Sequence, residues 1–177
     1  LQPDMMTMAK GLTSGYVPMS AVMVGDRVAT RLIADGGEFY HGFTYSGHPV
    51  AAAVALANLE IIEGEGLVKR VRQETGPYLA EALAPLAEHR LVGEVRTYGM
   101  LAAIELVKSK DGPELFSDTG TVGAICRDHA IAGGLMMRAV RDAMILSPPL
   151  TFTRDDIYET VRIARRALDL TADQLGL

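Results

Sequence analysis

The chain has 177 residues, and its 17 basic and 22 acidic side chains give a net charge of −5. Apolar residues make up 49% and charged residues 22%, a balance typical of a folded globular protein. The lysines and arginines form no dense run, which argues against nucleic-acid binding. The longest apolar stretch, 49–59, is far shorter than the roughly 20 residues that cross a membrane. The single cysteine, Cys126, excludes a disulfide framework, so we expect a reducing, cytoplasmic location.

The first third of the chain predicts a strand and two helices. The apolar run 21–24, ended by Gly25, predicts a buried strand, and residues 26–34 predict a short helix with an N-cap. Glycine, histidine, serine and threonine fill residues 40–49 and predict a loop. Residues 50–63 are dense in alanine and leucine, lack glycine and proline, and predict a long helix.

The rest of the chain predicts further helices and several strands. Residues 67–88 have apolar side chains at helical spacing, with Pro77 and Pro85 placed to bend or divide the helix. Residues 92–107, interrupted by Gly99, predict two strands or one bent strand. The remaining expected elements are a loop at 108–120, a helix at 121–132, strands at 135–138 and 144–146, and a helix from an N-cap at Thr153 to about residue 170.

This mixture of helices and short strands predicts an α/β or α+β fold, with the helix at 50–63 as the bridge between two units. The chain opens with Leu1-Gln2-Pro3-Asp4, without an initiator methionine, a basic leader or a signal-like apolar segment. We therefore expect it to be a piece of a longer protein.

Lys10 stands out among the four lysines because its sequence neighbours are apolar or small. It follows Met5-Met6-Thr7-Met8-Ala9 and precedes Gly11. An amine that loses hydration in such surroundings becomes a better nucleophile and base, and the small neighbours leave room for a flat cofactor. The alternative is a lysine at a strand end that extends into water.

The segment 41–49 offers a second candidate site. Its two glycines, its hydroxyls and its free amides precede a helix, which favours anion or phosphate binding, although an ordinary capping loop has the same composition. Its histidines have no cysteine or carboxylate partner at metal-ligand spacing, so we expect no metal. A third candidate is Arg138, which follows the apolar residues 135–137 and could bind a carboxylate with two parallel hydrogen bonds.

Together these segments resemble the class III aminotransferases, which are pyridoxal-phosphate enzymes of fold type I. Residues 3–12, with GYVPMSA at 15–21, are similar to the family's lysine segment. HGFTYSGHPV at 41–50 is similar to its second signature, and 138–150 is similar to its third. The resemblance covers about residues 3–170 and looks most like the ω-amino acid:pyruvate transaminases.

The resemblance implies a site built around pyridoxal 5'-phosphate. Lys10 matches the Schiff-base lysine, and Phe43 lies in the cofactor-binding segment. Thr44 matches the threonine that reaches across a homodimer interface to the phosphate held by the other subunit. Arg138 matches the arginine that binds the substrate carboxylate and swings aside for uncharged amines. Arg141 stands where the family usually has a glycine, so the turn geometry and the choice between Arg138 and Arg141 stay open.

The resemblance also implies that the chain is the C-terminal portion of an enzyme. Residues 1–57 would be the end of the large cofactor-binding domain, and 58–177 the small C-terminal α+β domain. A missing N-terminal segment would carry the phosphate loop, the aromatic residue that stacks on the pyridine ring and the aspartate that keeps the ring nitrogen protonated. We therefore expect the chain by itself to be inactive.

The expected activity of the whole enzyme is transfer of an amino group from an amine or ω-amino acid to a keto acid such as pyruvate. We expect a homodimer or a higher oligomer, with no metal, nucleic-acid or membrane partner. Two alternatives stay open: another class III member that acts on ornithine, 4-aminobutyrate or an aminomutase substrate, and a non-catalytic piece that depends on a separate N-terminal chain.

Overall fold

The computed structural model describes residues 2–112 and 114–177. Contacts divide the chain after Gly66 into a first unit, which ends there, and a second unit, Leu67–Leu177. The predicted domain boundary between residues 57 and 58 falls inside a continuous helix of the first unit. The assignment of the two units to the large and small domains of an enzyme stays a prediction. None of the helices in the described part of the chain is long and apolar enough to span a membrane.

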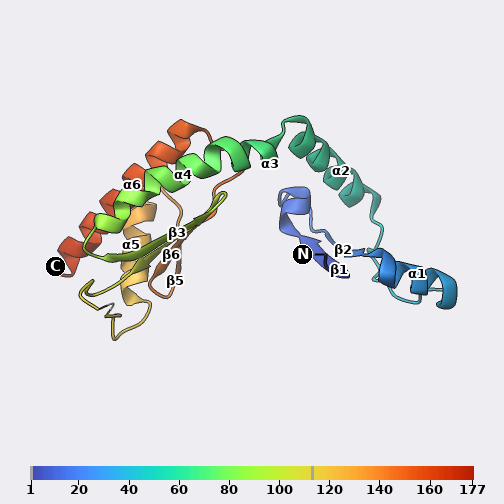
Figure 1. Ribbon diagram of the computed structural model, residues 1–177, viewed down its shortest axis with the longest axis horizontal. Helices are drawn as coiled ribbons and strands as arrows, with labels where there is room; N and C mark the ends of the chain where they lie inside the picture. Colours follow the sequence, from blue (N-terminus) through green and yellow to red (C-terminus); the bar gives the residue numbers. More distant parts are fainter. Residues whose placement is uncertain (1, 113) are drawn as a thin grey trace. The chain divides into compact units, whose positions relative to one another are not determined.

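The first unit consists of a β-hairpin and two helices, labelled in Figure 1. Strand β1 (Met5–Ala9) leads into a 3-10 turn, Lys10–Thr13, and pairs antiparallel with β2 (Ser20–Val24). Helix α1 (Asp26–Asp35) follows with Gly25 at its N-cap, and α2 (Pro49–Gly64) begins with Pro49 in its first turn. The strand at 21–24, both helices and the intervening loop are confirmed.

The expectation that the strand at 21–24 is buried is wrong for this chain. Val22 and Met23 are 58% and 57% exposed, because β2 pairs with β1 in a two-stranded ribbon and the described residues place no layer over it. Apolar side chains are exposed on helix α2 as well: Ala55 is its one buried residue, while Leu56, Leu59 and Ile61 are exposed. The first unit thus keeps much of its apolar surface in contact with solvent.

The second unit begins with a helical stretch that is divided as the prolines predict. Helix α3 (Leu67–Arg70) passes through a π-helical turn, Val71–Thr75, into α4 (Gly76–Leu83), and a 3-10 turn, Ala84–Glu88, ends it. Pro77 stands in the first turn of α4, after the π-helical turn, and Pro85 stands at the start of the 3-10 turn that follows α4. Each proline lacks the N–H that would continue the preceding hydrogen-bond pattern.

An antiparallel sheet with strand order β3-β4-β6-β5 forms the centre of this unit. Its strands are β3 (Val92–Tyr98), β4 (Leu101–Leu106), β5 (Arg138–Val140) and β6 (Ala143–Leu146). Burial alternates along β4 and β6, because the helices α4 and α5 (Thr121–Ala132) cover one face of the sheet, and α6 (Arg154–Gln174) packs against both helices. The core includes Leu79, Leu83, Ile104, Leu106, Met144, Ile157 and Leu168.

Most of the predicted elements of this unit are confirmed, and one strand is displaced. Residues 92–107 form two strands joined at Gly99, which has a φ of 56°. Thr153 caps α6 in a capping box with Asp156. The strand expected at 135–138 is wrong, because the Leu135 N–H caps the end of α5 by donating to the Ala130 carbonyl, and the strand therefore begins only at Arg138.

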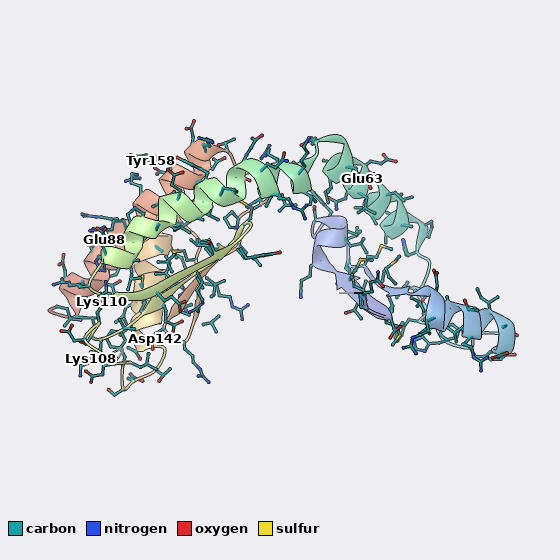
Figure 2. The ribbon with its side chains drawn as sticks, in the orientation of Figure 1. Glu63, Glu88, Lys108, Lys110, Asp142 and Tyr158 are labelled. Atoms are coloured by element: carbon teal, nitrogen blue, oxygen red, sulfur yellow. The ribbon has the colours of Figure 1, made fainter. Side chains whose placement is uncertain are left out.

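A buried carboxylate joins the sheet to the helical layer. Asp142, labelled in Figure 2, comes from the turn between β5 and β6 and is 6% exposed. Its two oxygens accept hydrogen bonds from the N–H groups of Gly120 and Gly123, both at 2.9 Å, at the N-terminus of α5. The N-cap residue of α5 is a glycine, which has no side chain to accept these hydrogen bonds. The Asp142 carboxylate, from the turn between β5 and β6, accepts them instead. A Cβ on Gly123 would lie 2.1 Å from the Arg141 carbonyl oxygen, which shows how closely the turn and the helix approach.

Replacement of Asp142 by alanine should lower the free energy of unfolding by about 3 kcal/mol, because each hydrogen bond to a charged group contributes roughly 1.5–3 kcal/mol. Urea unfolding followed by circular dichroism measures the change. Asp111→Ala, which removes an exposed loop carboxylate, is the matched control and should have little effect. A similar small loss for both variants would show that Asp142 is not a tertiary cap.

His89 is a second buried polar residue of this unit. Its Nδ1 accepts a hydrogen bond from the Leu91 N–H at 3.1 Å, and its Nε2 lies 3.3 Å from Asp169 Oδ1. Burial lowers the pKa of His89, and the nearby Arg165 and Arg90 act in the same direction, while Asp169 opposes them. Because Nδ1 serves as an acceptor, the neutral imidazole fits this position.

Acid should therefore destabilise the second unit through His89. In the unfolded chain the histidine pKa is about 6.5, so above this pH His89 is neutral in both the folded and the unfolded state and its contribution to stability is complete. Below this pH the unfolded chain binds a proton at His89 that the folded chain binds less readily, and stability falls. The free energy of unfolding should fall as the pH is lowered from 7 to 5.5, by at most about 1.4 kcal/mol per pH unit. His89→Asn retains a hydrogen-bond acceptor near the position of Nδ1 but does not titrate, so the loss of stability caused by protonation of His89 should vanish in this variant. His41→Asn, at an exposed histidine, is the control and should keep the pH dependence of the parent chain. An unchanged pH dependence in His89→Asn would contradict the assignment.

Candidate functional site

The first unit contains a cavity of about 910 Å³. It is bounded by the end of β1, the turn that follows it, the start of β2, the loop before α2 and the first turn of α2. Its polar lining includes Lys10, Ser20, Ser46 and His48, and the remaining walls are mainly apolar. This size lies within the range of small-molecule sites, which typically combine apolar walls with a few polar groups.

Lys10 is the first residue after β1, and its backbone is strained. Its φ is 53°, in the left-handed region that residues with a side chain rarely adopt, at a cost of about 1–3 kcal/mol. Positive φ returns after the 3-10 turn, with 49° at Ser14 and 77° at Gly15. The Gly15 N–H donates to the Lys10 carbonyl at 3.3 Å. We call residues 10–15 the lysine turn.

The apolar sequence neighbours of Lys10 do not bury its side chain. Lys10 is exposed, and Met5 and Met6 on β1 are also exposed. The dehydration expected from the sequence is therefore not provided by the described residues, since a hairpin without a covering layer leaves its side chains in water. What the structure does show is that Lys10 lines the cavity.

Asn58 is a site residue that the sequence analysis missed. From α2 its side chain forms three hydrogen bonds with the lysine turn, to Gly11, Leu12 and Ser14. The sequence gives little indication of this role. Asn58 is a single amide side chain among the alanines and leucines of the helix, and such a residue is equally compatible with a solvent-exposed position.

The loop before α2 brings one of its two predicted cofactor-binding residues to the cavity. The Phe43 N–H donates to Ser46 Oγ at 2.9 Å, and Phe43 and Ser46 both line the cavity. Thr44 is exposed and is not among the lining residues, so this chain does not bring Thr44 together with Lys10.

Arg138 and Arg141 belong to the second unit and occupy different positions there. Arg138 is exposed on β5, directly across from Ile145 of β6. Arg141 is the first of two turn residues between these strands and has a φ of 54°, so the turn forms with an arginine in the conformation that favours glycine. A third arginine, Arg96, is paired with Glu94 and Glu105.

Two other features concern the cysteine and the metal-binding side chains. Burial raises the pKa of Cys126 to about 11, so this thiol is a poor nucleophile near neutral pH. Residues 2–112 and 114–177 contain no group of three or more histidine, cysteine, aspartate and glutamate side chains placed to hold a metal ion.

The sequence matches the aminotransferase class-III family over residues 1–168. The chain belongs to the class III aminotransferases. Among curated relatives it is 55% identical to a putrescine–pyruvate aminotransferase of Pseudomonas aeruginosa, over 96% of this chain and 37% of that protein. It is 43% identical to a diaminobutyrate–2-oxoglutarate transaminase of Halomonas elongata, over 99% of this chain and 38% of that protein.

Solved structures of transaminases show the same fold. A transaminase from an ancestral-reconstruction study matches with a TM-score of 0.93 and 41% identity, over 99% of this chain and 39% of that one. The omega transaminase of Pseudomonas jessenii in complex with PMP matches with a TM-score of 0.90 and 40% identity, over 99% of this chain and 39% of that one. The predicted mixed α/β fold of a fold type I transferase is thereby confirmed. The chain spans less than two fifths of the length of these relatives.

Proposed function

We propose that this class III aminotransferase chain is the C-terminal portion of an enzyme that transfers an amino group from an amine or ω-amino acid to a keto acid such as pyruvate. The observation that carries the proposal is the position of Lys10, which lines the cavity immediately after β1. Family membership supplies the reaction class, and the lysine is the residue type that this chemistry requires.

The residues around the cavity fit the cofactor of the family, pyridoxal 5'-phosphate. A phosphorylated aromatic aldehyde needs an amine for its carbonyl, hydrogen-bond donors for its phosphate and an apolar wall for its ring. Lys10 provides the amine, Ser20 and Ser46 provide hydroxyls, and Phe43 provides an aromatic wall. The relative from Pseudomonas jessenii, which was solved with PMP, supports the same assignment.

Lys10 would act twice in the reaction. It would hold the cofactor between turnovers, and after the amine donor displaces it, the free Nζ would take up the proton that leaves the donor carbon. The bound cofactor supplies an electron sink for the negative charge that develops at that carbon. A general base of this kind contributes about 10²–10⁴-fold to the rate.

Thr44 and Phe43 would complete the cofactor site in a homodimer. Thr44 is exposed and does not line the cavity of its own chain, so its hydroxyl is free to reach the phosphate held by a second subunit. Phe43, one residue earlier, would remain at the cavity of its own subunit. The dimer, or a higher oligomer, is part of the proposal, as is the N-terminal segment that would supply the rest of the site.

Arg138 would bind the substrate carboxylate. It is exposed on the sheet and has no ion-pair partner among the described residues, whereas Arg96 on the same sheet is paired with two glutamates. Arg141 is the alternative, because it occupies the neighbouring turn.

The amine donor is proposed from the relatives. The 55% identical aminotransferase is named for putrescine and pyruvate, which favours a diamine donor and pyruvate as acceptor. Gamma-aminobutyrate transaminases of tomato and rice, 35% identical, keep a 4-aminobutyrate donor as the second candidate.

Lys10→Ala in the full-length enzyme should abolish covalent attachment of the cofactor and lower turnover by about 10²–10⁴-fold. Borohydride reduction followed by intact-mass measurement detects attachment, and turnover is measured with putrescine and pyruvate. Lys69→Ala, at another exposed lysine, is the control and should keep both properties. Near-normal transamination by Lys10→Ala would overturn the proposed function.

Arg138→Ala should lower kcat/KM for pyruvate by roughly 10- to 100-fold, because a charge-assisted hydrogen bond is worth about 1.5–3 kcal/mol. The single-turnover reaction with a carboxylate-free amine should change much less. Arg141→Ala is the matched comparison and should spare both reactions. Equal losses with acid and amine in Arg138→Ala would show that Arg138 is structural, and a selective loss in Arg141→Ala would assign the carboxylate to Arg141.

A further inference from the structure

Asn58 forms a hydrogen-bonded link between α2 and the lysine turn. Its Nδ2 donates to the Gly11 carbonyl at 2.9 Å and to the Leu12 carbonyl at 3.2 Å, and its Oδ1 accepts from Ser14 Oγ at 2.6 Å. The two partners of Nδ2 are separated from Asn58 by more than 45 positions in the sequence. One side chain therefore holds three residues of the turn.

The chemistry of these partners requires an amide. Backbone carbonyls only accept hydrogen bonds, so the group that faces Gly11 and Leu12 must carry two N–H donors, and the atom that faces Ser14 accepts. Aspartate has nearly the same shape but would place an oxygen against two carbonyl oxygens. Leucine would fill similar space and make none of the three bonds.

The link holds a segment that would otherwise relax. Lys10 has a φ of 53° and Ser14 has a φ of 49°, and such conformations persist only where the surroundings enforce them. Around the turn, the Gly15 N–H bonds to the Lys10 carbonyl and Thr13 Oγ1 donates to the Val17 carbonyl. Those bonds lie within the turn and its continuation, whereas the Asn58 bonds anchor it to a separate helix.

We propose that Asn58 is a positioning residue for Lys10. By holding the carbonyls of Gly11 and Leu12, it keeps the Lys10 backbone in its left-handed conformation and so directs Nζ into the cavity. The effect on the reaction rests on the proposed role of Lys10, whereas the effect on the turn concerns the backbone alone.

The test compares Asn58→Asp and Asn58→Leu with Ser14→Ala in the full-length enzyme. Glu60→Gln, at an exposed residue of the same helix, is the control. Three quantities are measured: amide hydrogen exchange at Gly15 in the cofactor-free enzyme, the rate at which the cofactor-free enzyme captures pyridoxal phosphate covalently, and kcat and KM for the amine.

Asn58→Asp and Asn58→Leu should both accelerate exchange at Gly15, and should slow covalent capture and kcat by at least about tenfold, because both variants lose the N–H donors to the Gly11 and Leu12 carbonyls. KM for the amine should stay within about twofold, because the residue acts through Lys10 and does not touch substrate. Ser14→Ala leaves both carbonyl bonds in place and should have a smaller effect. Glu60→Gln should behave like the parent enzyme.

Wild-type exchange, capture and kcat in Asn58→Asp would overturn the proposal, because that variant keeps the shape of the side chain and removes both N–H donors. A rise in KM with unchanged capture would overturn it as well. Exchange at Gly15 needs no cofactor, so failure of the proposed function, seen as retained activity in Lys10→Ala, is distinguishable from failure of the positioning role.

Discussion

The turn that follows β1 is the constraint on which the candidate site of this class III chain depends. Lys10 lies at a strand end, where the backbone would ordinarily continue extended or enter a helix with a negative φ. Instead the chain reverses through Lys10, Ser14 and Gly15, all at positive φ. Hydrogen bonds from Asn58 and a bond between Gly15 and Lys10 hold this turn, and Lys10 lines the cavity together with Phe43 and Ser46.

The two units differ in how completely they bury their apolar residues. The second unit has a continuous core between one sheet face and three helices, and Asp142 and His89 are buried within it with hydrogen-bond partners. The first unit exposes apolar side chains on β2 and α2. Burying such residues fully would contribute about 1.5–3 kcal/mol each, and these 177 residues do not realise that free energy.

Charge on the sheet of the second unit is distributed unevenly. Arg96 is bound by Glu94 on its own strand and by Glu105 on the next, and these contacts raise its pKa further. Arg138 at the other edge of the sheet has no such carboxylate within the described residues. A guanidinium without an internal partner can bind an external carboxylate without first breaking an ion pair, and this is the reason for proposing Arg138 rather than Arg96 as the substrate-binding arginine.

The sequence by itself determined the features that depend on nearby residues. Alanine and leucine content determined α2, the prolines divided the helical stretch after Leu67, and Thr153 with Asp156 capped α6, because propensity and capping act within a few residues. The segments around Lys10, Thr44 and Arg138 also carried enough local pattern to indicate the family. Tertiary structure alone decided the exposure of β2, the start of β5, the Asp142 cap and the Asn58 link. Each of these depends on which distant groups meet, and an isolated asparagine or aspartate in a sequence does not show which donors and acceptors the fold will bring to it.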